Sequence, residues 1–195
     1  MSEFASWGPL TAWQRLRAGL PVGDWPAAVV FRCSDAGLSG PAFLGPNTGS
    51  LIEVSTWGHT VDTGVLATLE YAVTVHDVPL VVVLGHPGCH AMRLAMQAWT
   101  EADLPKDGSR GTVEQVISSI VRRGTQADSV DSISSAHIVE TGLAILERSP
   151  VIARRIDSGE CAIVCATTQP SDGRLRVHAT IGAVGEVDDS LMECV

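Results

Sequence analysis

The sequence predicts an α/β fold, with a mostly parallel central sheet, one antiparallel edge strand and helices flanking the sheet. Two continuous apolar runs, at residues 27–31 and 79–84, have the length of strands that are buried on both faces, as in parallel sheets. Segments with helical hydrophobic periodicity alternate with the strand-like runs. Near the end of the chain, a Ser-Asp-Gly turn at 171–173 joins two strand-like runs, which indicates a hairpin and hence an antiparallel edge.

The first 60 residues are predicted to contain one helix and two strands. The helix covers residues 11–20 with Thr11 as its N-cap. Its apolar stripe consists of Leu10, Trp13, Leu16 and Leu20. The strand at 27–31 leads directly into Cys33, a loop rich in Gly, Pro, Ser and Asn covers 34–50, and a short strand covers 51–55.

Helices and strands alternate through the rest of the chain. One helix is capped by Asp62 or Thr63 and ends near His76, and another follows the second buried strand and ends near Trp99. The remaining predicted helices cover 112–123, 129–147 and 150–156, and the last two strands cover 160–168 and 175–181. In the longest helix, the residues expected to face inward are Ile133, His137, Ile138, Leu143 and Leu146.

Length and composition bound the architecture and the location. The 195 residues, 45% of them hydrophobic, suffice for one well-packed core, so we predict a single α/β domain over 1–195, with a helical arm at 9–22 and an acidic tail at 186–195. No apolar run approaches the roughly 20 residues of a membrane helix, and the first residues lack the features of a secretory signal. We therefore expect no membrane partner and a cytoplasmic location.

Charge and cysteine content narrow the function classes. The net charge is −9 and no basic cluster exceeds a pair of arginines, which disfavours nucleic-acid binding. Five cysteines form an odd set in a chain without export features, which argues against a disulfide framework. The remaining roles for the cysteines are metal-binding thiolates and buried thiols that pack in the core. Cys161 and Cys165, four residues apart in one strand, are interpreted as packing thiols.

A metal-ligand set lies where the two buried strands leave the core. Cys33 ends the first strand with Asp35 two residues on, and His86 and Cys89 follow the second strand. Ligands of open α/β sheets bind beyond the carboxyl ends of strands, so the topology is expected to bring these residues together. A buried cysteine or histidine alone is more often structural. Three of them at matching strand ends favour a zinc site with one open coordination position.

These segments resemble the β-carbonic anhydrases. The family motifs Cys-x-Asp-x-Arg and His-x-x-Cys correspond to Cys33-Ser-Asp35-Ala-Gly37 and His86-Pro-Gly-Cys89, and the similarity extends from about residue 9 to 185. The resemblance implies a Zn²⁺ ion held by Cys33, His86 and Cys89, assembly as a homodimer or tetramer, and reversible hydration of CO2 to bicarbonate by zinc-bound hydroxide. Asp35 is placed to accept a hydrogen bond from that hydroxide.

The chain departs from the family around the expected substrate pocket, which Gly58 also lines. Gly37 replaces the motif Arg that pairs with the aspartate, leaving Asp35 free to become a fourth metal ligand and to impair or alter the activity. The other departures are Pro46 in place of Gln, Trp57 in place of a small residue, and His90 in place of Gly. His90 has three interpretations: a surface residue beginning a helix, a proton shuttle or a substitute ligand.

Two other functions are compatible with the same ligands. One is a zinc hydrolase or lyase acting on another small electrophile, because the substitutions for Arg and Gln remove polar contacts sized for bicarbonate. The other is a non-catalytic, zinc-stabilised homologue, in which Asp35 would occupy the fourth metal position under all conditions. Arg32 directly precedes Cys33 in the strand, so the two side chains should point to opposite faces. Arg32 is therefore not expected to replace the missing cation.

Overall fold

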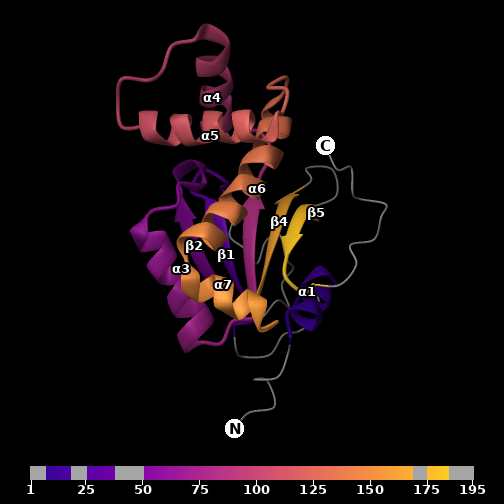
Figure 1. Cartoon of the computed structure of the whole chain (residues 1–195). Helices are drawn as coiled ribbons and strands as arrows, with labels where there is room; N and C mark the ends of the chain where they lie inside the picture. Colours follow the sequence, from indigo (N-terminus) through magenta and orange to yellow (C-terminus); the bar gives the residue numbers. More distant parts are fainter. Residues whose placement is uncertain (1–7, 19–25, 38–50, 169–174, 185–195) are drawn as a thin grey trace.

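The computed structural model describes residues 8–18, 26–37, 51–168 and 175–184. They contain a five-stranded sheet with the strand order β2-β1-β3-β4-β5 (Figure 1). The first four strands in this order are parallel, and β5 pairs antiparallel with β4 at one edge, which confirms the predicted fold class. The bounds are β1 (Ala28–Cys33), β2 (Leu51–Thr56), β3 (Leu80–Gly85), β4 (Ala162–Thr168) and β5 (Leu175–Ile181).

The helices lie close to their predicted positions. They are α1 (Pro9–Arg17), α3 (Thr63–Val75), α4 (His90–Glu101), α5 (Arg110–Arg123), α6 (Val130–Arg148) and α7 (Pro150–Asp157), with a short 3-10 turn, η2 (Trp57–His59). Asp62 is the N-cap of α3, since its side chain accepts a hydrogen bond from the Val65 backbone N–H. Within the described residues, no helix combines the length and hydropathy that crossing a bilayer requires.

Two sequence-based details were wrong. Helix α1 begins at Pro9, whose missing N–H suits the first helical position, rather than being capped by Thr11, and Leu10 is 39% exposed. In α6, Leu146 packs against the core as predicted, but Leu143 is only half-buried, and Ile145, which the prediction omits, is fully buried. The predicted hairpin turn at 171–173, Leu20 and the acidic tail lie outside the described residues.

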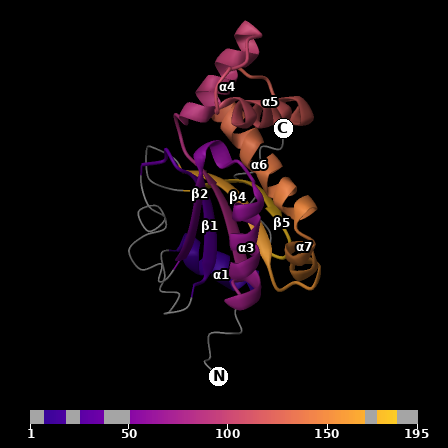
Figure 2. The same ribbon diagram turned by 90° about the vertical axis from the view of Figure 1, so that its left-hand side faces the viewer.

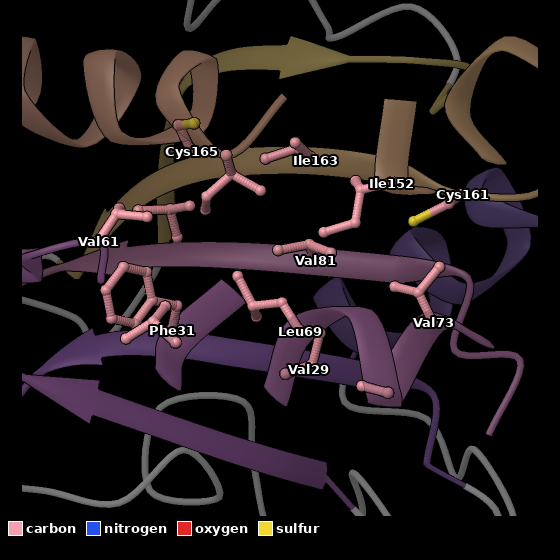
Figure 3. Packing of buried hydrophobic residues seen from close by; sticks show 14 of the residues in the cluster. Val29, Phe31, Val61, Leu69, Val73, Val81, Ile152, Cys161, Ile163 and Cys165 are labelled. Carbon is pink, nitrogen blue, oxygen red and sulfur yellow. The ribbon is translucent and has the colours of Figure 1, made fainter. Parts of the chain in front are cut away.

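Helices cover both faces of the sheet. Alternate strand residues such as Val29, Phe31 and Val81 pack toward α3, α6 and α7 (Figures 2 and 3). Their strand neighbours Val30 and Val82 face the opposite way and pack with residues of α1. The strands are therefore buried on both sides, as their continuous apolar sequences indicate.

Helices α4 and α5 stand beyond the carboxyl ends of the parallel strands (Figure 1). With Ile133 of α6, they form a separate apolar cluster that also contains Cys33 and Cys89. Strand β1, which ends at Cys33, and strand β3, which precedes Cys89, are direct neighbours in the centre of the sheet. The end of the sheet and the helical cap thus meet at the predicted metal ligands.

Candidate metal centre

Four side chains converge at the junction of β1, β3 and α4. Cys33 is the last residue of β1, His86 directly follows β3, and Cys89 is the N-cap of α4. With Asp35, they offer ligand atoms that all lie within 4.8 Å of one another. The structure therefore brings together the four residues that the sequence singles out, from segments more than 50 residues apart.

The distances within this cluster suit a shared cation. The Sγ atoms of Cys33 and Cys89 are 3.8 Å apart, close to the roughly 3.8 Å that tetrahedral geometry imposes on two sulfurs bound at about 2.3 Å. Asp35 Oδ1 lies 2.8 Å from Cys33 Sγ, 3.7 Å from Cys89 Sγ and 2.6 Å from His86 Nε2. One carboxylate oxygen thus contacts all three other ligand atoms.

The donor chemistry also fits a metal. His86 Nε2 is buried and lies 2.6 Å from Asp35 Oδ1, but none of the described residues meets it with good hydrogen-bond geometry, which is costly for a polar atom. A cation bound by the nitrogen lone pair would satisfy it. Two thiolates and one imidazole form a ligand set typical of catalytic zinc, and hard cations such as Mg²⁺ prefer oxygen ligands.

Burial and the close contacts within the cluster shift the pKa values of its members. The neighbouring Cys89 thiol, followed by burial, raises the pKa of Cys33, whereas the contact with Cys33 lowers the pKa of Cys89. Burial opposes the charged form of His86, but the Cys33 sulfur and the Asp35 carboxylate raise its pKa overall. A cation must displace protons from Cys33 and His86, so metal uptake should weaken in acid.

A backbone N–H, rather than an arginine, holds the outer oxygen of Asp35. Its Oδ2 accepts a 2.9 Å hydrogen bond from the backbone N–H of His90, the first residue of α4. Burial opposes its charged form, yet the hydrogen bonds from Cys33 and from this N–H lower the pKa of Asp35 overall. Arg32 points elsewhere and pairs with Glu53 of β2, at 2.9 Å.

The remaining predicted pocket residues are placed as follows. Trp57 is half-buried, packs against the apolar cluster under α4 and α5, and has its ring centroid 6.0 Å from that of the exposed His90. Gly37 is exposed in a left-handed conformation, with φ of +67°. Gly58 donates its backbone N–H to Cys33 Sγ, at 3.1 Å. Pro46 lies outside the described residues.

One contact beside the cluster is absent from the sequence-based reasoning. His137 of α6, which the sequence places only in the core, donates from Nε2 to the Gly58 carbonyl at 2.9 Å. Its Nδ1 lies 2.9 Å from the Ser119 hydroxyl of α5. The two partners are 79 residues apart in the chain, so no local spacing could have indicated this contact.

The sequence is similar to those of known carbonic anhydrases. A family model described as carbonic anhydrase matches residues 28–175. Carbonic anhydrase 2 of Mycobacterium tuberculosis is 40% identical over 171 residues, covering 87% of this chain and 83% of that protein. A carbonic anhydrase of Mycolicibacterium smegmatis is 38% identical over 172 residues, covering 88% of this chain and 84% of its own length.

The solved structures agree on the architecture. A β-carbonic anhydrase of Coccomyxa, in complex with acetazolamide, has a TM-score of 0.67 at 18% identity, covering 88% of this chain and 79% of that one. The β-carbonic anhydrase CcaA has a TM-score of 0.64 at 16% identity, covering 87% and 85%. Family model, curated relatives and fold agree, and the chain belongs to the β-carbonic anhydrase family.

Proposed function

We propose that this protein binds zinc through Cys33, His86 and Cys89 and catalyses the reversible hydration of CO2 to bicarbonate. The observation that carries the proposal is the convergence of these three ligand atoms and Asp35 within 4.8 Å. When bound there, zinc would lower the pKa of water enough for attack on CO2 near neutral pH. The names of the curated relatives support the same reaction.

Asp35 is proposed to orient the attacking water by accepting its hydrogen bond. The His90 N–H keeps one carboxylate oxygen fixed, and the other faces the ligand atoms. Since the depressed pKa keeps Asp35 ionised, its free oxygen can only accept a hydrogen bond at neutral pH. The two thiolates already neutralise a divalent cation, so this acceptor matters more than at a site of three imidazoles.

The activity is proposed to be reduced or altered because position 37 is Gly. Within the described residues, the Asp35 carboxylate contacts the two thiols, a histidine and a backbone N–H, and no guanidinium draws it away from the cluster. Asp35 Oδ1 is therefore free to enter the fourth coordination position and to compete with water for it.

We propose a homodimer or tetramer in the cytoplasm. Two β-carbonic anhydrases of Sordaria macrospora are tetrameric, and one chain from these structures matches this fold with a TM-score of 0.66 at 20% identity. Tyr71 and Val75 of α3 expose apolar surface that a second subunit could cover.

Metal analysis combined with stopped-flow CO2 hydration tests the proposed function. We expect stoichiometric zinc and measurable hydration in the wild type, and loss of both in Cys89→Ser. Cys161→Ser is the matched control, because Cys161 is a buried thiol far from the cluster, and it should retain both. Zinc-loaded wild type without hydration would contradict the proposal, and turnover of small esters would then favour a hydrolase.

A further inference from the structure

A buried chain of hydrogen bonds connects two helices to the Cys33 sulfur. The backbone N–H of Gly58 donates to Cys33 Sγ at 3.1 Å, and the Gly58 carbonyl accepts from His137 Nε2 at 2.9 Å. His137 Nδ1 contacts the Ser119 hydroxyl at 2.9 Å. The histidine is 3% exposed and Ser119 is 4% exposed, so water does not compete strongly for these bonds.

The direction of the chain follows from its partners. A carbonyl can only accept, so His137 Nε2 carries a proton and donates to Gly58. Burial lowers the pKa of His137 to about 4, so the ring is neutral at physiological pH and its Nδ1 is an acceptor. The Ser119 hydroxyl has one proton and two acceptors within reach, His137 Nδ1 at 2.9 Å and the Gln115 carbonyl at 3.1 Å. When it donates to Nδ1, the closer of the two, it fixes the tautomer that donates toward Gly58.

The Gly58 peptide needs this support because its turn is strained. Gly58 adopts its φ of +64° at little cost, but His59 has a φ of +54°, which is unfavourable for a residue with a Cβ. His59 Nε2 contacts the Leu84 carbonyl at 2.9 Å, which holds this residue in place. His137 holds Gly58 through its carbonyl oxygen. The N–H of the same residue is the group that donates to Cys33 Sγ.

We propose that His137, oriented by Ser119, is a positioning residue for the metal centre that keeps the Gly58 N–H on the Cys33 sulfur. The inference rests on the proposed function, in which Cys33 is a metal ligand. An N–H donated to a ligand thiolate stabilises its negative charge and fixes its direction. Without the His137 contact, the Gly58 turn can relax and the N–H can leave the sulfur.

Cobalt-substituted protein provides a readout other than activity, because the thiolate-to-Co²⁺ absorption reports on the sulfur. His137→Leu removes the donor and should weaken metal affinity, measured by chelator competition, about 10- to 100-fold, and shift the absorption. His137→Gln places an amide nitrogen near the Nε2 position and should restore most of both. Thr141→Val, one turn further along α6, is the buried control and should change neither.

Ser119→Ala removes the orienting hydroxyl together with its contact to the Gln115 carbonyl within α5. It should fold and should shift affinity and absorption in the same direction by a smaller amount. A folded His137→Leu or Ser119→Ala protein with wild-type affinity and spectrum would overturn the inference, as would equal losses in His137→Leu and His137→Gln. If the wild type itself takes up no Co²⁺, the proposed metal centre fails as well, so the two failures are distinguishable.

Discussion

The backbone N–H of His90 donates a 2.9 Å hydrogen bond to Asp35 Oδ2, across 55 residues of sequence. Because His90 is the first residue of α4, this N–H is one of the amides that a helix leaves unpaired at its positive end. The helix terminus thus holds the carboxylate at a position where the sequence supplies Gly37 instead of a cation. The contact anchors Asp35 beside the ligands without drawing it away from them.

Asp35→Asn tests the role of this carboxylate. Asparagine keeps the shape, but when its one oxygen accepts from His90, the amide nitrogen faces the cluster and cannot accept a hydrogen bond. We expect kcat/KM for CO2 hydration to fall by about 10²-fold or more, with zinc content retained. Asp107→Asn, at an exposed site away from the cluster, is the control and should leave kcat/KM unchanged. Undiminished hydration by Asp35→Asn would contradict the role assigned to the carboxylate.

Gly37→Arg tests whether the missing cation limits activity. A Cβ at this position meets only the Asp35 carbonyl oxygen, at 4.0 Å, so there is room for a side chain. The φ of +67° should still cost about 1–2 kcal/mol of stability for any such side chain. Gly37→Ala is the matched control with the same strain and no donor. Only the Arg variant should hydrate CO2 faster than wild type, and equal rates in both variants would refute this.

Gly58→Ala should be the most damaging small substitution near the site. A Cβ there would lie 2.4 Å from Thr112 Cγ2 and 2.8 Å from Ala91 Cβ, at a φ of +64°. We expect a loss of about 2–4 kcal/mol in unfolding free energy, measured by denaturant titration, from overpacking and strain. Adding Thr112→Ser removes the closest methyl group and should recover part of this loss. No recovery would show that the strain alone dominates.

Acid should destabilise the fold through its buried histidines. Burial lowers the pKa of His59 to about 3 and of His137 to about 4, below the ordinary 6.5 that applies in the unfolded chain. Between these values and 6.5 the unfolded state binds more protons, so stability falls as pH falls, by up to about 1.4 kcal/mol per pH unit for each group. His137→Gln should show a shallower decline between pH 7 and 5, since one such group is gone, and an unchanged slope would contradict the assignment.

A close approach between α6 and β4 predicts a compensating pair. A Cβ on Gly142 would lie 2.6 Å from the Cys165 sulfur. Gly142→Ala should cost about 1–3 kcal/mol, and Cys165→Ala should lose packing, but the double variant should lose less than their sum. Denaturant unfolding of the four proteins measures this, and additive losses would disprove the contact. Zinc content should be unchanged throughout, because Cys165 lies in the core under α6.

The parts of the molecule set by local patterns were predictable. The apolar runs of β1 and β3 indicate buried parallel strands, and parallel strands end on the same side, so Cys33 and His86 could be expected to meet. The start of α1 was missed because Pro9 is a stronger start signal than a Thr11 cap. The hydrogen bond from His137 to Gly58 depends on how α6 packs across the end of the sheet. This packing cannot be predicted from the spacing of residues in the sequence.

Cys33 and Cys89 lie in the apolar cluster that joins α4 and α5 to the sheet, apart from the two clusters on the sheet faces. An ion bridging these sulfurs would therefore fasten the helical cap to the central strands. Chelation should loosen this cap as a local cooperative unit while the sheet remains folded. In that case amide hydrogens of α4 and α5 would exchange faster in the apoprotein, and those of β1 and β3 would remain protected.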